Sequence, residues 1–254
     1  LMLLGTNSRE ITENNATSLE DKQLLNIMDE LKVAAGMRYR PRIFIIEANY
    51  MNAFASGYSE KSALVAITRG LLNKLKRDEL QAVMAHELSH IRHGDIKLTL
   101  VASVLANIML IVVDILFYSV IFGGGGRDDS RSRNQFAWVI ILLRYLLPLV
   151  TLFLLLFLSR KREFMADAGS VELTRDPSPM ARALMKIQQD YQDNAEEYSA
   201  PSNKEKHENL RRQAYIFEPI SAGIGKSTDP SDWFSTHPSI KKRLAALGYR
   251  STKD

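Results

Sequence analysis

Two long apolar stretches interrupt a chain in which polar and apolar residues otherwise alternate over short distances. The first covers Leu98–Phe122 and the second covers Phe136–Leu158. Each exceeds the roughly 20 residues that an α-helix needs to cross the hydrocarbon core of a bilayer. The segment between them, GGGGRDDSRSRNQ, is short and polar. The pattern predicts a transmembrane helical hairpin, whereas the alternative, a pair of buried core helices, fits such long apolar runs poorly.

Charged residues within and beside the hairpin indicate its partners and its orientation. Each stretch contains one charge, Asp114 or Arg144, and we expect each to contact a partner because an isolated charge in a bilayer is costly. Basic residues flank the hairpin more strongly at its open end than in its loop, where two aspartates offset the arginines. The flanking basic residues are Arg92, Lys97, Arg160, Lys161 and Arg162. This bias predicts that the open end faces the cytoplasm.

The remaining segments predict an α+β, mostly helical fold in which a small sheet packs against helices. A capping box at Thr17 and Ser18 opens a helix that ends near Gly36. We expect a polar segment, residues 194–209, to be mobile. The expected strands are Arg42–Ile46 and Ala63–Thr68, with a strand or hairpin over 50–58. The other expected helices are Leu71–Leu75, one capped by Asp78 with Gln81 at its third position, Met180–Tyr191 and Ser239–Leu247.

Composition narrows the chemistry that these elements can support. The formal net charge is only +4 over 254 residues, so we expect no nucleic-acid partner. Cysteine is absent, which excludes disulfides and thiolate ligands, so a zinc site would need histidines and carboxylates. The first residues, LMLLGTNSRE, are too short an apolar run for a span or a signal core. We interpret them as the remainder of a longer segment or as a processed terminus.

The segment MAHELSHIRHGD, residues 84–95, contains three of the five histidines. Residues four apart on an α-helix share a face, so His86 and His90 can direct their imidazoles at one metal ion. Glu87 is rotated by about 100° from His86, too far to join the pair but near enough to act as a general base toward a metal-bound water. The alternative is a surface helix with two hydrogen-bonded histidines, which the apolar LQAVMA before the motif disfavours.

A catalytic zinc site needs a third protein ligand and an open position. A hairpin returns the chain to the side of the membrane that it left, so residues just after the second stretch lie near those just before the first. Glu163 follows the second stretch in LSRKREFMADAG. It is therefore a candidate third ligand, although a juxtamembrane charge paired with Arg160 or Lys161 is equally consistent with the spacing. Asp167, four residues on, is placed to accept the second ring N–H of a ligand histidine.

The pairing of HELSH with SRKREFMADAG resembles the M48 family of integral-membrane zinc metalloproteases. NAFASG, residues 52–57, and THPSIKKRL, residues 236–244, narrow the resemblance to its HtpX-like heat-shock branch, with the Ste24-like CAAX-processing proteases as more distant relatives. The resemblance extends from about Ile43 to Leu247. HtpX-like members usually have two further membrane spans before the catalytic region, of which only LMLL would remain here.

This resemblance implies roles for individual residues. It implies that His86, His90 and Glu163 bind zinc, that Glu87 is the catalytic glutamate and that Asp167 supports a ligand. It also implies a zincin-like catalytic domain that faces the cytoplasm from the bacterial inner membrane. Its expected substrates are misfolded or damaged membrane proteins.

Several other residues are candidates for supporting roles. His237, just before the last helix, could donate a hydrogen bond to the oxyanion, and Arg243 is a weaker candidate. His93 is a surface or second-layer histidine by its position three residues after His90. Asp95 could cap a helix or support a ligand. Asn52 lies where a sheet edge could receive substrate as an added strand, although core packing is the simpler interpretation.

We therefore expect a membrane-anchored, zinc-dependent endopeptidase with one zinc ion per chain and polypeptide substrates. Residues 1–97 and 159–254 would form the two parts of the catalytic domain, and residues 98–158 the transmembrane hairpin. One alternative is a catalytically silent membrane scaffold whose zinc has four protein ligands, the fourth being His93. Another is a Ste24-like processing protease, for which two spans form too small a chamber.

Overall fold

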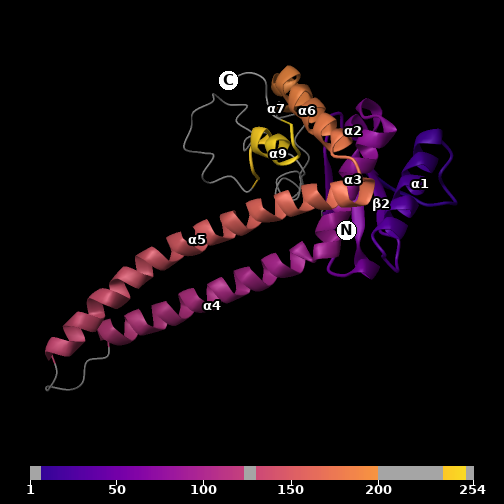
Figure 1. Cartoon of the computed structure of the whole chain (residues 1–254). Helices are drawn as coiled ribbons and strands as arrows, with labels where there is room; N and C mark the ends of the chain where they lie inside the picture. The colour runs from indigo at the N-terminus through magenta and orange to yellow at the C-terminus, as the bar shows by residue number, and fades with distance from the viewer. Residues whose placement is uncertain (1–6, 123–129, 200–236, 250–254) are drawn as a thin grey trace. The chain divides into compact units, whose positions relative to one another are not determined.

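The computed structural model describes residues 7–122, 130–199 and 237–249, which form a small mixed sheet and several helices (Figure 1). The chain divides into two compact units, residues 1–96 with 159–254 and residues 97–158. The sheet and the short helices belong to the first unit, whereas the second contains most of two long helices. The predicted fold class, α+β and mostly helical with a small sheet, is confirmed.

The sheet has four strands in the order β1-β2-β4-β3. Strands β2 and β4 are parallel, and β1 and β3 pair antiparallel at the two edges. The bounds are β1 Ser8–Ile11, β2 Arg42–Ile46, β3 Ala53–Ser56 and β4 Leu64–Thr68. The hydrophobic pattern predicted β2 and β4 and left β3 open between strand and hairpin. It missed β1, whose short and largely polar sequence becomes a strand through its pairing with β2.

One face of the sheet joins helices α1, Leu19–Ala34, and α3, Arg77–His93, in the larger hydrophobic core. Helix α1 begins as predicted, because the Ser18 hydroxyl accepts a hydrogen bond from the Asp21 backbone N–H at 3.0 Å. Its buried face carries Leu24, Ile27, Met28 and Leu31. This packing holds α3 against strand β3, so the helix with the two histidines rests on a rigid base.

The predicted cap of α3 was wrong. The backbone N–H of Lys76, one residue before the helix, donates to the Glu79 carboxylate at 2.8 Å, and Asp78 lies inside the first turn. Glu79 is buried and also pairs with Lys186 of α6 at 2.7 Å, so tertiary packing selected it as the cap. At the other end the helix stops at Gly94, which adopts a left-handed conformation with φ of 67°.

Helices after the hairpin close the first unit. Helix α2 spans Arg69–Lys74, and a short 3-10 turn covers Glu60–Ser62. Helices α6, Ser178–Asp193, and α9, Ile240–Ala246, lie where the pattern predicted them and pack against each other. Residues 195–199 were expected to be mobile but form α7, because the Tyr198 ring packs on Tyr191 and its hydroxyl bonds Asp190 at 2.9 Å. The rest of that expected mobile segment, 200–209, lies outside the described residues.

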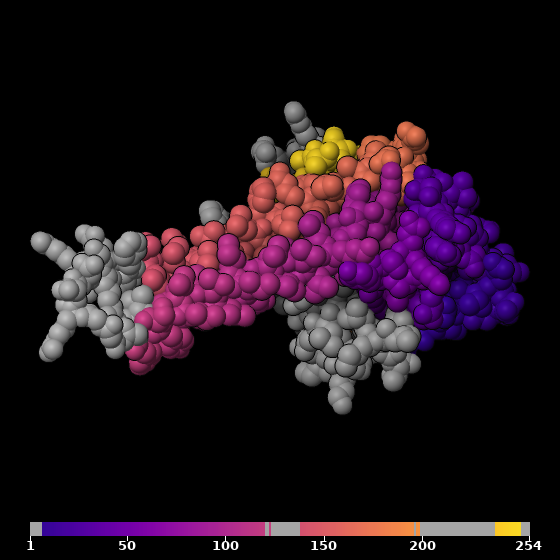
Figure 2. All heavy atoms as spheres, turned by 90° about the horizontal axis from the view of Figure 1, so that it is seen from below, coloured from indigo at the N-terminus to yellow at the C-terminus, as the bar shows by residue number. Residues whose placement is uncertain are grey.

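The second unit contains most of α4, Asp95–Phe122, and α5, Ser130–Thr174, which run side by side (Figures 1 and 2). Within the described residues both are long and apolar enough to cross a membrane, and only 0% and 6% of their most apolar windows are buried. Their exposed apolar side chains disagree with the alternative of buried core helices and favour the predicted hairpin. Asp114 and Arg144, each expected to have a partner, pair with one another at 2.9 Å, and the guanidinium also lies over the Phe117 ring.

The final turns of α5 pack closely against α3 within the first unit. Gly169 lies so close to Ser89 that a Cβ at this glycine would lie 2.4 Å from the Ser89 hydroxyl oxygen. The next residue, Ser170, donates to the Ala82 carbonyl at 2.7 Å. Small side chains therefore permit the helix approach that carries Glu163 toward the two histidines.

A substitution at this contact tests its importance. Gly169→Val should destabilise the fold by about 1–3 kcal/mol, since the new methyl groups overlap Ser89 and push the two helices apart. The thermal unfolding midpoint and the metal content should both fall. Ala168→Val is the matched control, because Ala168 is exposed on the same helix turn and should change neither quantity. Equal effects of the two substitutions would contradict the role assigned to this contact.

Candidate metal centre

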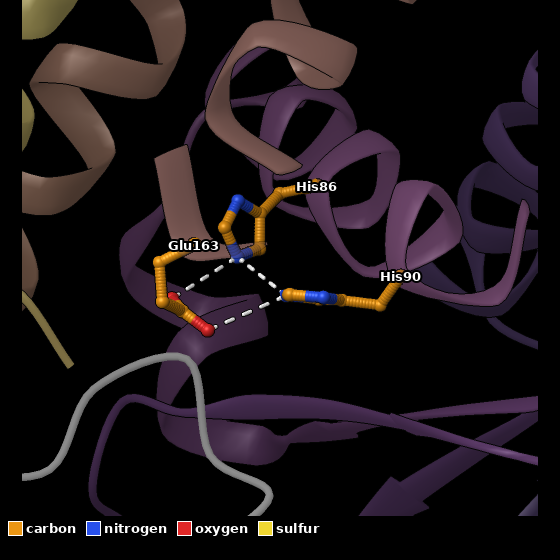
Figure 3. A group of neighbouring side chains, drawn as sticks. All are labelled: His86, His90 and Glu163. Carbon is orange, nitrogen blue, oxygen red and sulfur yellow. Dashed lines mark hydrogen bonds and ion pairs between the residues drawn. The ribbon is translucent and has the colours of Figure 1, made fainter. Parts of the chain in front are cut away.

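Three side chains that are distant in sequence converge within the first unit. His86 and His90 project from the same side of α3, and Glu163 reaches them from α5 (Figure 3). Each contributes one possible ligand atom, and these three atoms lie within 4.8 Å of one another. His86 and Glu163 are buried, whereas the His90 side chain keeps 19% of its surface exposed. The structure therefore brings together the three residues proposed from the sequence as ligands.

The distances within this cluster fit a four-coordinate ion. The two Nε2 atoms of His86 and His90 are 3.2 Å apart. Glu163 Oε2 lies 3.8 Å from His86 Nε2, and Glu163 Oε1 lies 3.6 Å from His90 Nε2. Atoms that bind a tetrahedral zinc ion at 2.0–2.2 Å would be about 3.3–3.6 Å apart. The separations of 3.2, 3.6 and 3.8 Å are close to this spacing, with a different Glu163 oxygen nearest each ring. The chemistry of the donors matches a His₂Glu catalytic zinc site.

Each histidine has its other ring nitrogen next to a carboxylate. His86 Nδ1 is 3.0 Å from an oxygen of Asp167, and His90 Nδ1 is 2.6 Å from an oxygen of Asp95. A carboxylate accepts hydrogen bonds, so it favours the tautomer with the proton on Nδ1. That tautomer leaves the lone pair on Nε2, directed at the centre of the cluster.

Two lone pairs and a carboxylate that face one point repel each other unless a cation lies between them. Burial lowers the pKa of His86 to about 4. Burial also lowers the pKa of His90, but Asp95, Glu163 and Glu87 outweigh it and raise the value to about 9. The two rings therefore shift in opposite directions, and metal binding would compete with protons for the same ring nitrogens.

Glu87 lies beside the cluster and has the properties of a proton-transfer group. The residue is 2% exposed, and burial raises the pKa of its carboxyl group to about 7. It accepts a hydrogen bond from the backbone N–H of Ala55 in edge strand β3. Its second oxygen, Oε1, is buried without a hydrogen-bond partner among the residues that the structure describes. A group of this kind can bind and release a proton near neutral pH.

Two residues from the C-terminal segment complete the surroundings. His237 Nδ1 lies 3.2 Å from Glu163 Oε2, so its ring stands at the cluster, as the sequence suggested. Arg243 on α9 is 1% exposed and forms two hydrogen bonds to Asp167. The guanidinium thus contacts the carboxylate behind His86, and its Nη1 lies 3.5 Å from Glu163 Oε2. The role as an oxyanion donor stays a prediction.

Some candidates stand outside the cluster. His93 is exposed and does not belong to the group of possible metal ligands found among the described residues. Asn52 is fully buried, and its side-chain oxygen accepts from the Ala53 N–H at 2.9 Å while its backbone N–H donates to Thr68 Oγ1 at 2.8 Å. These bonds fix the start of β3 and agree with the simpler interpretation of this residue.

Sequence reasoning missed one contact and left another undecided. Arg162 donates to the Asp95 carbonyl at 2.7 Å, which ties the start of α4 to α5. Asp95 was left between a helix cap and a ligand support, and its carboxylate contacts His90. The available signal was the short interval from His90 across Gly94 to Asp95, since a glycine that ends a helix turns the chain back toward its last turn.

Comparison with known proteins gives a consistent family. Residues 18–251 match the family model described as "Peptidase family M48". The chain is 41% identical over 250 residues to the "Protease HtpX homolog" of Helicobacter pylori strain Shi470, covering 98% of this chain and 74% of that protein. It is 36% identical over 255 residues to the "Protease HtpX homolog" of Streptococcus equi subsp. equi strain 4047, covering 97% of this chain and 78% of that protein.

A solved structure has the same fold at lower sequence similarity. The crystal structure of S. mikatae Ste24p superimposes with a TM-score of 0.54 at 20% identity and covers 87% of this chain. This chain spans about half, 49%, of the Ste24p chain. The family match extends over nearly the whole sequence and includes every residue of the cluster described above. The chain belongs to peptidase family M48 and is a membrane metalloprotease.

Proposed function

We propose that the chain is a zinc-dependent endopeptidase in which His86, His90 and Glu163 hold the metal. The observation that carries this proposal is the cluster itself. One possible ligand atom from each of the three residues lies within 4.8 Å of the others, and both histidines have a carboxylate beside Nδ1, which favours a lone pair on Nε2. A His₂Glu set without a cysteine favours zinc over softer or purely oxygen-bound metals.

The chain's own residues supply the proton chemistry in this proposal. A bound zinc ion would polarise the scissile carbonyl and lower the pKa of the attacking water. Glu87, whose pKa burial raises to about 7, takes a proton from that water at Oε1 and later gives it to the leaving amine nitrogen. The hydrogen bond that Glu87 accepts from the Ala55 N–H ties its carboxylate to edge strand β3, next to the cluster.

His237 is proposed as a hydrogen-bond donor to the oxyanion that forms on the peptide carbonyl. Its ring lies beside Glu163 with only 10% of its side chain exposed, so its orientation is restricted. Preorganised donors of this kind act where negative charge develops during the reaction. A second role is to orient the Glu163 carboxylate, and the substitution described below separates the two roles.

The membrane arrangement is also a proposal. Residues 1–97 and 159–254 form the catalytic domain, and residues 98–158 form a hairpin that anchors it in the inner membrane of a bacterium. The excess of basic residues at the open end supports a catalytic domain on the cytoplasmic side. Anchoring next to the bilayer favours polypeptides within or near the membrane, so we propose misfolded or damaged membrane proteins as substrates.

Two other functions have less support. A silent zinc scaffold requires four protein ligands, but the group of possible ligands within the described residues has three and leaves out His93. A Ste24-like processing protease has only a shared fold in its favour, at 20% identity. The silent scaffold does not explain why Glu87 is buried beside the cluster with an oxygen that has no hydrogen-bond partner among the described residues.

The role of Glu87 can be tested by Glu87→Gln. The amide cannot take a proton from water, so kcat for cleavage of an unfolded protein should fall by about 10²–10⁴-fold. Zinc content, measured by atomic spectroscopy on the purified full chain, should be unchanged because Glu87 is not a proposed ligand. Glu172→Gln is the control, since this exposed α5 glutamate pairs with Arg92 outside the cluster. Full proteolysis by Glu87→Gln would overturn the mechanism.

The role of His237 can be tested by His237→Gln. If His237 donates a hydrogen bond to the oxyanion, the variant should lose about 10²–10³-fold in kcat with little change in KM. It should retain zinc. Lys242→Gln on the exposed side of α9 is the control and should behave like the unmodified chain. Loss of zinc from the His237 variant would assign the residue to orienting Glu163 instead.

Orientation can be tested without removing any native thiol, because the chain has no cysteine. The cysteine of a Lys61→Cys variant, in the proposed catalytic domain, should react with a membrane-impermeant maleimide in inverted inner-membrane vesicles, whose cytoplasmic face is outside. It should not react in intact spheroplasts. A cysteine at Asp128 in the hairpin loop should react from the opposite side. Labelling of both positions from one side would contradict the hairpin.

A further inference from the structure

Arg243 stands out among the groups around the cluster, because it is one of the largest fully buried side chains yet carries a permanent charge. Its Nε donates to Asp167 Oδ2 at 2.9 Å, and its Nη2 donates to Asp167 Oδ1 at 2.6 Å. The same Oδ1 atom lies 3.0 Å from His86 Nδ1. One carboxylate oxygen therefore joins the guanidinium to a proposed ligand.

This geometry restricts how Asp167 can rotate. Two parallel bonds from a planar guanidinium hold both carboxylate oxygens, which fixes the plane of the group. With the plane fixed, Oδ1 stays directed at His86 Nδ1. His86 is then held with its Nδ1 proton toward Asp167 and its Nε2 lone pair toward His90 and Glu163.

Arg243 also supplies the opposite charge that a buried carboxylate needs. Asp167 is 2% exposed, and the guanidinium pairs with it inside the core. A carboxylate accepts hydrogen bonds, so Asp167 favours the His86 tautomer with hydrogen on Nδ1 and the lone pair on Nε2.

We propose that Arg243 is a positioning residue that acts through Asp167 to hold His86 in its metal-binding tautomer and orientation. Arg243 belongs to α9, which packs against α6, and Ile240 of α9 and Leu247 just after it lie in the core. The metal centre therefore depends on docking of α9, which lies far along the chain from both α3 and the Glu163 turn. This inference rests on the proposed zinc site and adds to it a requirement for the C-terminal helix.

A purely electrostatic role makes the opposite prediction. Arg243 Nη1 is 3.5 Å from Glu163 Oε2, so its positive charge also lies near the proposed ligands and would repel an incoming cation. If charge alone mattered, removal of Arg243 would tighten metal binding. If positioning matters more, removal weakens binding despite the lower positive charge.

The test uses the full chain in detergent, stripped of metal and titrated with zinc against a competing chelator. Arg243→Met should weaken zinc binding by about 10–100-fold, as expected when the residue behind a ligand is lost. Cobalt(II) bound in place of zinc should show a changed visible absorption spectrum, because the spectrum reports ligand geometry. Arg243→Lys keeps the charge without the planar fork and should recover only part of the affinity.

Arg69→Met is the matched control. Arg69 makes the same two-bond contact, from Nε and Nη2 to the carboxylate of Glu47, at 3.1 and 2.7 Å, but outside the cluster. It should leave zinc affinity and the cobalt spectrum unchanged.

A double variant separates action through Asp167 from direct action and avoids leaving a buried charge unpaired. Asp167→Asn alone should weaken zinc binding, and adding Arg243→Met should weaken it less than about twofold further. A further loss of tenfold or more in the double variant, with an unchanged circular dichroism spectrum, would overturn action through Asp167. Equal or tighter zinc binding by Arg243→Met would overturn positioning. Failure of the unmodified chain to bind zinc or cobalt would instead overturn the proposed function.

Discussion

The close approach of α3 and α5 is the contact on which the proposed metal centre depends. Ser89 and Gly169 leave no room for a further side-chain atom between the helices, and the Ser170 hydroxyl bonds to the α3 backbone. This spacing carries Glu163 to within 4 Å of two imidazole nitrogens. A larger residue at either position would separate the helices, and the three donor atoms would no longer surround one point. The chemistry therefore depends on the small size of two side chains that take no part in it.

The second constraint is electrostatic. The cluster gathers lone pairs and carboxylates in a buried region, an arrangement that is unfavourable without a cation. Carboxylates behind the two histidines set the tautomers, and arginines in turn contact those aspartates, Arg243 at the Asp167 carboxylate and Arg162 at the Asp95 carbonyl. Each histidine is thus held through an aspartate by a different part of the chain. Such a site is preorganised for a metal and gains little from rearrangement when the metal binds.

Much of the secondary structure follows from local pattern. The α1 cap at Ser18, strands β2 and β4, the two apolar helices and α6 were predictable because each depends on residues a few positions apart. The errors share a cause. Strand β1 forms through pairing with β2, the α3 cap is Glu79 because Lys186 of α6 neutralises it, and α7 forms because Tyr198 packs on Tyr191. In each case a distant part of the chain decided the outcome.

The same distinction applies to the metal centre. The sequence alone determined that His86 and His90 share one face of a helix and that Glu87 points about 100° away from His86. Helical periodicity sets the directions of side chains within one turn. Through the hairpin and the family resemblance, the sequence also indicated Glu163 as a ligand and Asp167 as a support for a ligand histidine. It gave no distances between these side chains. Only the tertiary structure decided that Asp95 contacts His90 and that Arg243 contacts Asp167. The first contact crosses the break between two helices, and the second joins residues 76 positions apart in sequence. Local periodicity carries no information about which distant side chains meet.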